Sequence, residues 1–353
     1  MLHVTYAGGE PKPDALAGGP RNNVDAIKSD GTVVPDVLDA SRFPRGVELL
    51  ELRGITVGSD GRLWVVSGAQ TTSQIIRFAG ELVNGKHAFV DVVASGIEHR
   101  PPSSAAAYEA IVHPFAIVFP PRSSAWFVSS QDTNVVTGPL PELPTPALVP
   151  PTASYLTSTY PDGAFLPSTF VASACGNLDG APITTTPVPL PQGLETAFEH
   201  GACEMRSDER GKLTHSVRGL AHDGALLYVA DEPGNQVKAY EPSGKLAWAW
   251  PPPPQALVTI VTPVHLLHHD GHLYVGSSGT DSVVRLDLAT RTSTPVATGI
   301  KTISGLARDP SGRLYVASRT HKKVYYVEPG STTHTEYASL EDEPEFLLYV
   351  SDT

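Results

Sequence analysis

The chain repeats one short motif along much of its length, and this repeat constrains the fold more than any other feature. Copies begin at Leu52, Val217, Val264 and Ile303, and the copy at Val217 reads VRGLAHDGALLYVADEPGNQVKAY. Each copy reads as an apolar strand, a turn with Gly or Asp, a second alternating strand, a polar loop and a third strand. Units of four strands that recur along a chain predict an all-β fold, a β-propeller, in a single domain over residues 1–353.

The two ends of the chain read as parts of one further unit. The C-terminal PEFLLYVSDT resembles the first strand of a copy, and the N-terminal MLHVTYAGG resembles a second strand. We therefore expect the N- and C-terminal strands to share one blade and so close the ring. With a divergent copy at His113 this gives a six-bladed β-propeller, while the long interval between His113 and Arg218 leaves seven blades as an alternative.

Loop insertions are predicted at about residues 97–112, 138–160 and 172–216. Long loops on a rigid scaffold are where binding specificity usually lies. The last insertion contains both cysteines, Cys175 and Cys203, so we expect a disulfide between them. That bond would imply an oxidising compartment, extracellular or periplasmic, whereas two free thiols would fit a cytoplasmic protein.

Charge and hydropathy limit the kinds of partner that the chain is expected to bind. The 353 residues carry a formal net charge of −12 with no cluster of Lys and Arg, which argues against nucleic acid. No apolar run reaches the ~18 residues that a membrane span needs. We expect a monomer whose partner is a small-molecule substrate or ligand.

The copy GLAHDGALLYVADEPGNQVKAYEPSG resembles an NHL-type repeat. The resemblance is to the propeller superfamily that includes amidating lyases, virginiamycin B lyase, gluconolactonases and strictosidine synthase-like proteins. It implies a ligand at one mouth of the central channel, held by residues at the start of the innermost strands. In the amidating lyases, histidines there resemble zinc ligands; His113 and His265 match that position, although Pro114 follows His113 rather than preceding it.

Aligned first strands bring polar residues from different blades to one level at the channel mouth. These residues are Arg53, His113, Arg218, His265 and Ser304, with Glu345 as the sixth. On this alignment His113, His265 and Glu345 fall on alternate blades, and two imidazoles with a carboxylate suit a divalent metal such as zinc or calcium. Because clustered cations need an anion nearby, we also expect Glu345 or a ligand carboxylate beside the arginines.

The predicted catalytic residues are Arg53, Arg218, Tyr108 and Glu345. Arg53 and Arg218, together with Ser304, are expected to contact substrate, because guanidinium groups hold carboxylates and oxyanions. Tyr108, in the loop before His113, is a candidate acid or base.

Three classes of function stay open. The first is a metal-assisted lyase or hydrolase, and the second is a metal-free enzyme that uses Glu345 or a loop carboxylate as base. The third is a non-catalytic propeller that binds a small molecule, a glycan or a protein. Long loops and a mixed Arg/His ring favour an enzyme with a recessed site. The plainer interpretation is a wet channel whose polar side chains bond only water and neighbouring strands.

One copy of the motif contains four histidines, which are His265, His268, His269 and His272. With a rise of ~3.3 Å per residue, His265 and His269 lie about 13 Å apart along one face of a strand, and His268 points to the other face. We interpret this set as structural rather than as one metal cluster.

Overall fold

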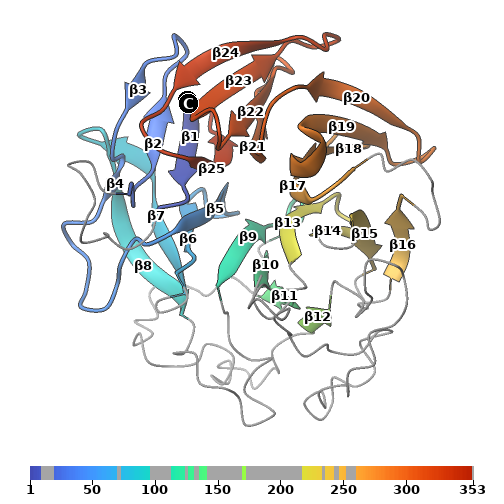
Figure 1. The fold of residues 1–353 in the computed structure, drawn as a ribbon. Coiled ribbons are helices and arrows are strands. Elements are labelled where there is room, and N and C mark those ends of the chain that lie inside the picture. Colours follow the sequence, from blue (N-terminus) through green and yellow to red (C-terminus); the bar gives the residue numbers. More distant parts are fainter. Residues whose placement is uncertain are drawn as a thin grey trace, which may run out of the picture.

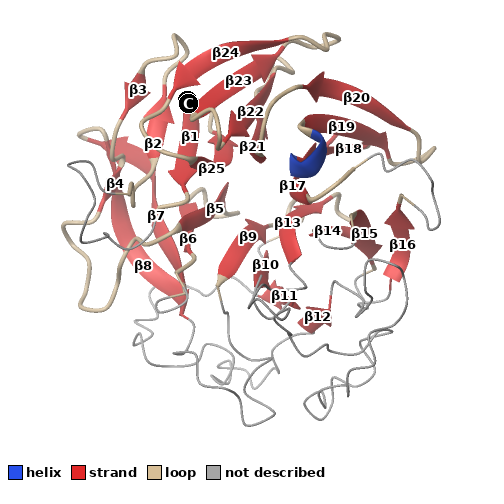
Figure 2. Ribbon diagram, viewed as in Figure 1, coloured by secondary structure: helices blue, strands red, loops and turns tan. Residues whose placement is uncertain are grey.

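The protein is an all-β ring of sheets around a central axis (Figures 1 and 2). This computed structural model describes residues 1–8, 20–69, 73–95, 113–123, 126–130, 135–140, 169–171, 217–232, 235–241, 246–251 and 260–351. Within these ranges the only helical element is one 3-10 turn at Ser278–Thr280. None of the described helices is long and apolar enough to cross a membrane. The predicted all-β propeller fold is confirmed.

The described strands form five four-stranded sheets and one five-stranded sheet. One four-stranded sheet consists of β9 (Pro114–Val118), β10 (Trp126–Ser130), β11 (Val135–Leu140) and β12 (Thr169–Val171). A second consists of β13 (Val217–His222), β14 (Leu227–Asp231), β15 (Gln236–Tyr240) and β16 (Leu246–Trp250). A third consists of β17 (Pro263–His269), β18 (His272–Ser277), β19 (Ser282–Asp287) and β20 (Ser293–Thr298). A fourth consists of β21 (Ile303–Arg308), β22 (Leu314–Ser318), β23 (Lys323–Val327) and β24 (His334–Ser339).

The two remaining sheets contain the first part of the chain. One consists of β25 (Pro344–Tyr349), β1 (Leu2–Tyr6), β2 (Asp25–Ile27) and β3 (Val33–Val34). The other consists of β5 (Leu52–Val57), β6 (Leu63–Ser67), β7 (Gln74–Val83) and β8 (Lys86–Ser95), with β4 (Leu38–Asp39) paired parallel to β8 at its outer edge. This fifth strand departs from the expected four-strand unit, because the connection from β3 to β5 pairs along β8 on its way.

The terminal strands pair with each other. β25 runs antiparallel to β1, with Leu2 opposite Tyr349 and Val4 opposite Leu347. The innermost strands contact one another in the order β5, β9, β13, β17, β21, β25 and back to β5. In Figure 1 these strands surround the axis of the ring.

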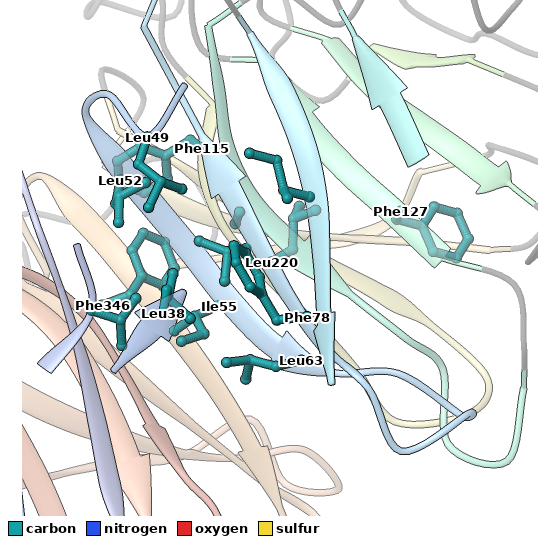
Figure 3. Packing of buried hydrophobic residues seen from close by; sticks show 14 of the residues in the cluster. Leu38, Leu49, Leu52, Ile55, Leu63, Phe78, Phe115, Phe127, Leu220 and Phe346 are labelled. Carbon is teal, nitrogen blue, oxygen red and sulfur yellow. The ribbon is translucent and has the colours of Figure 1, made fainter. Parts of the chain in front are cut away.

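The apolar core is divided into wedges between neighbouring sheets. Figure 3 shows part of the largest cluster, which continues across several sheets and in which Leu52 and Ile55 of β5 pack with Phe115 of β9 and Phe346 of β25. Trp64 and Trp126, from adjacent sheets, lie 5.5 Å apart between ring centroids. Since a fully buried large apolar side chain contributes about 1.5–3 kcal/mol, these wedges hold the sheets to their neighbours.

Glycines allow the innermost strands to approach each other. A Cβ on Gly219 would lie 2.6 Å from the Val264 carbonyl oxygen and 2.9 Å from the His265 Cα. In the same way Gly54 faces the Ala116 Cα and Gly305 faces the Phe346 Cα. Sheets with a glycine therefore alternate with sheets that carry a side chain at the matching position.

Several expectations fall on parts of the chain outside the described residues. These are the insertions at about 97–112 and 172–216, most of the insertion at 138–160, and the expected disulfide between Cys175 and Cys203. The division into one domain with these insertions stays a prediction.

Candidate functional site

Four of the six predicted mouth residues lie at one level. Arg53, Arg218, Ser304 and Glu345 are each the second residue of an innermost strand. The two histidines are off this level, so the expected single ring was wrong for them. His113 lies one residue before β9, and His265 is the third residue of β17, beyond a register shift that follows Pro263.

His113 belongs instead to a set of residues that turn the chain into an innermost strand. It has φ 46, and Glu51, Thr262 and Thr302 hold the same place before their own strands with φ 49, 53 and 49. A positive φ is uncommon outside glycine and is often a sign of a functional constraint. Its recurrence in four sheets makes it a property of this fold, and it fixes where the His113 side chain starts.

Glu345 is a buried carboxylate between two arginines. Its side chain is 2% exposed; its Oε1 lies 3.4 Å from Nη1 of Arg53 and its Oε2 lies 3.4 Å from Nε of Arg319. Arg53 comes from β5 and Arg319 follows β22, so guanidinium groups from the two neighbouring sheets flank the carboxylate. Glu345 is therefore the anion that accompanies Arg53.

The chain of contacts continues to His113. Oε2 of Glu51 lies 3.3 Å from Nη2 of Arg53 and 3.5 Å from Nε2 of His113. The connected groups, which we call the mouth arc, are His113, Glu51, Arg53, Glu345 and Arg319. They come from the beginnings of three innermost strands and from the loop after β22, so the arc spans four sheets.

Arg218 lies on another part of the mouth with its own partners. Its Nε is 2.6 Å from Oε2 of Glu232, and its guanidinium carbon lies 4.9 Å from the centroid of the Phe115 ring. Its backbone carbonyl accepts a 2.7 Å hydrogen bond from the Ser129 hydroxyl. Arg218 is therefore held in place, and an incoming anion would share it with Glu232.

His265 is neutral and lies toward the axis. Burial lowers its pKa to about 4, against a smaller opposing effect of its hydrogen bond to Ser304. Its Nδ1 lies 3.3 Å from the Ser304 carbonyl oxygen, which can only accept, so the proton is on Nδ1 and Nε2 carries the lone pair. The ring packs against Phe346 at 4.7 Å between centroids.

Ser304 joins two sheets. It is 1% exposed, and its hydroxyl donates a 2.6 Å hydrogen bond to the Pro344 carbonyl. Nothing in this geometry supports the expected contact with a substrate. Thr5 makes a comparable bond of 2.9 Å to the Arg53 carbonyl, so hydroxyl groups fix the backbone from which the mouth side chains project.

The remaining predicted groups gain no geometric support. Tyr108 lies outside the described residues. Within the described ranges no group of three His, Cys, Asp or Glu side chains is arranged to hold a metal. His113 lies before the level of Glu345 and His265 lies beyond it. We therefore assign no chemical step to a metal, and metal binding stays a prediction.

A cavity of about 460 Å³ is lined by residues outside the mouth arc, one of which, Asn22, accepts a 3.3 Å hydrogen bond from the Glu51 N–H. Residues lining it include Arg21, Asp36, Asp39 and Lys86. Its volume suits a small ligand. However, Arg21 is paired with Asp25 at 2.7 Å and with Asp36 at 3.0 Å, and none of the residues predicted for the site lines this cavity, so we do not place the site there.

Comparisons with known proteins support the fold. No protein-family model and no curated protein matches the sequence. A chain of the nidogen/laminin complex is similar in structure at a TM-score of 0.53 and 10% identity, covering 99% of this chain and 98% of that one. A candidate 6-phosphogluconolactonase from Bacteroides uniformis is similar at a TM-score of 0.50 and 12% identity, covering 95% and 80%.

Virginiamycin B lyase from Staphylococcus aureus is also similar, at a TM-score of 0.45 and 12% identity over 98% of this chain and 92% of that one. At such identities a likeness shows the fold alone. The two likenesses with TM-scores of 0.50 and 0.53 therefore support the β-propeller fold that the resemblance implied.

Proposed function

We propose that this propeller is an enzyme that acts on a small molecule at the channel mouth, as a lyase or a hydrolase. The observation that carries the proposal is the 2% exposed Glu345 carboxylate between Arg53 and Arg319. Buried ion pairs are often no more stabilising than apolar side chains of the same volume, because both charges lose their hydration. A buried charge pair beside further ionisable groups is therefore a candidate functional site.

The geometry suggests a role for each group. His113 beside Glu51 is an imidazole oriented by a carboxylate, an arrangement suited to a general acid or base. We assign Arg53 and Arg218 to stabilising a negative oxygen on the substrate. Both carboxylate oxygens of Glu345 face guanidinium groups, so Glu345 is assigned to positioning Arg53 rather than to accepting a proton.

The chemistry follows from these roles. In an elimination, His113 takes a proton from a carbon next to a carbonyl, the electron pair of that C–H bond forms the new double bond, and the leaving group departs with its own bonding pair. In a hydrolysis, His113 takes a proton from the attacking water. In either case an arginine stabilises the charge that develops on oxygen, and Tyr108 is kept as the proposed second acid.

We also propose that each of the six described sheets is one blade and that the ring closes through β25 and β1. Support comes from the register of Leu2 with Tyr349, from the 2.9 Å hydrogen bond of the Val350 N–H to the Met1 carbonyl, and from the cyclic contacts of the innermost strands. The mouth arc crosses this terminal sheet, since Glu345 lies on β25 and Arg53 on the next sheet. An intact site therefore depends on pairing of the termini.

The alternative is a non-catalytic propeller that binds a small molecule, a glycan or a protein. The structural likeness to a chain of the nidogen/laminin complex supports it by analogy of fold. The two proposals differ in whether a bound compound is converted.

The test is a panel of small carboxylic acids, esters and lactones, measured for binding by thermal shift and for turnover by mass spectrometry. Arg218→Ala should abolish binding of the compounds that shift the wild type. Arg313→Ala is the matched control, because Arg313 makes a comparable 2.6 Å ion pair with Glu328 just before β22, at the other end of the channel. Turnover supports the enzyme, and binding without turnover supports the alternative. Equal loss in both variants would contradict a site at the mouth.

A further inference from the structure

The hairpin of β17 and β18 lies at the end of the channel opposite the mouth. Its turn is Asp270-Gly271, with φ 46 and 70, and positive φ at both central residues is typical of a type I′ turn. His269 lies directly opposite His272 across this turn, and His272 lies directly opposite Asp287 on β19. Residues directly opposite each other share one face of a sheet, with Cβ atoms ~4.5–5.5 Å apart.

Two of these side chains are already oriented. Nδ1 of His272 lies 2.8 Å from the Asp270 carbonyl oxygen, to which it must donate, so in the neutral imidazole Nε2 carries the lone pair. This Nε2 lies 3.8 Å from Oδ2 of Asp287. Oδ1 of Asp287 accepts hydrogen bonds from the backbone N–H groups of Ala289 and Thr290, which holds the carboxylate in place. Metal-ligating histidines usually donate their other N–H to a carbonyl or carboxylate in this way.

We propose that His269, His272 and Asp287 form a surface site for a divalent transition metal of the zinc type. Two imidazoles and a carboxylate are ligands that zinc accepts, with a fourth position left for water. Bonds of ~2.1 Å around a tetrahedral zinc place two ligand atoms about 3.4 Å apart, so Nε2 of His272 and Oδ2 of Asp287 need only a small approach.

His269 has to rotate to complete the site. Its Nε2 now lies 2.9 Å from Oδ2 of Asp270. The side chains of these two residues are 40% and 84% exposed, so the rotation breaks an exposed side-chain contact and little packing. Within the described ranges no three such side chains already converge, so the site requires this rotation.

The site is separate from the mouth arc, and the proposal departs from our interpretation of this histidine run as structural. Distances along one strand place His265 and His269 far apart, but ligands can also come from neighbouring strands. The cross-strand register that brings His269, His272 and Asp287 together depends on the turn and on the pairing with β19. A bound ion would link three strands of this sheet, so it should raise the melting temperature in proportion to occupancy.

The experiment titrates the full chain with Zn²⁺ alone, by calorimetry at about pH 7.5, where histidine ligands are largely deprotonated. His269→Ala and His272→Ala should each weaken Zn²⁺ binding about tenfold or more, and Asp287→Asn should weaken it less. His334→Ala is the matched control, because His334 is also a strand histidine but lies opposite Val327 and has no second imidazole across the sheet. It should bind as the wild type does.

Melting curves without metal verify that each variant is folded. Co²⁺ serves as a second probe, and its visible absorption should show nitrogen ligation that both hairpin histidine variants lose. Zn²⁺ binding that is unchanged in His269→Ala and His272→Ala would overturn the proposal, as would an equal loss in His334→Ala.

Discussion

His265 should make the stability of the protein depend on pH in a way that one substitution removes. Burial lowers the pKa of this imidazole to about 4, below the ordinary value of 6.5 that applies to the unfolded chain. The unfolded state therefore takes up the proton first as the pH falls. The stabilisation is fully present above about pH 6.5 and is lost progressively between about pH 6.5 and about pH 4.

The size of the effect follows from the difference in pKa. Each pKa unit corresponds to about 1.4 kcal/mol, so the full loss is about 3–4 kcal/mol, of which about 2 kcal/mol is reached by pH 5. The imidazole is only 7% exposed and packs against Phe346, so solvent screening does not reduce this figure appreciably.

His265→Asn is the appropriate variant, because its side-chain amide can replace the Nδ1–H donor to the Ser304 carbonyl but does not titrate. Urea unfolding of both proteins between about pH 7.5 and about pH 5 gives the assay. The stability advantage of the wild type over the variant should shrink by about 2 kcal/mol across that range. The pKa values of His87 and His222 are also lowered by burial, but these residues are present in both proteins and their effects cancel. Parallel stability curves for the two proteins would refute a buried neutral His265.

Three further predictions test the scaffold. Gly219→Ala should lower the free energy of unfolding by about 1–3 kcal/mol, since its Cβ would lie 2.6 Å from a backbone oxygen of β17. Ala116→Gly on β9, where a Cβ is already accommodated, should lower it less. Urea unfolding measures both, and equal effects would contradict the packing of these strands. Thr5→Val should cost about 1–3 kcal/mol and Thr5→Ser much less, because the Thr5 hydroxyl both donates and accepts a buried hydrogen bond; equal losses would point to the methyl group instead. Deleting residues 345–353 should abolish cooperative unfolding in calorimetry, and an unchanged melting midpoint would contradict closure through the termini.

The strand pattern made the fold predictable. Alternating apolar residues and Gly- or Asp-containing turns mark β13, β17 and β21 in the sequence, and the same pattern placed Arg53 and Arg218 at equivalent positions. The Gly that follows each of these arginines is a second signal for that position, because it is required where innermost strands approach.

The histidines could not be placed from the sequence because a strand's first residue depends on its pairing. On β17 Pro263 lies opposite Ser277 and His265 opposite Gly276, just as Ile303 lies opposite Ser318 and Gly305 opposite Ala317 on β21. His265 therefore corresponds to Gly305 and lies one residue beyond the level of Ser304 and Arg53. The residues around His113 in the sequence do not show whether it lies inside a strand or just before one. That difference is set by the backbone, which has φ 46 at His113.

The ionic partners were missed for a related reason. Glu51, Glu232 and Arg319 lie in loops between strands, and only the assembled ring brings these loops to the mouth. The one available signal was the Glu-x-Arg spacing of Glu51 and Arg53, which places both side chains beside the start of β5.

The central claim is that the mouth arc is a catalytic site in which Glu51 orients His113. The most direct measurement is a double-mutant cycle of His113→Gln and Glu51→Gln on kcat/KM, with the panel compound that the wild type converts fastest. We predict that His113→Gln lowers kcat/KM by about 10²–10⁴-fold and that adding Glu51→Gln lowers it little further, since the two groups act as a unit. Variants that retain wild-type kcat/KM, or two losses that simply multiply, would contradict this account of the site.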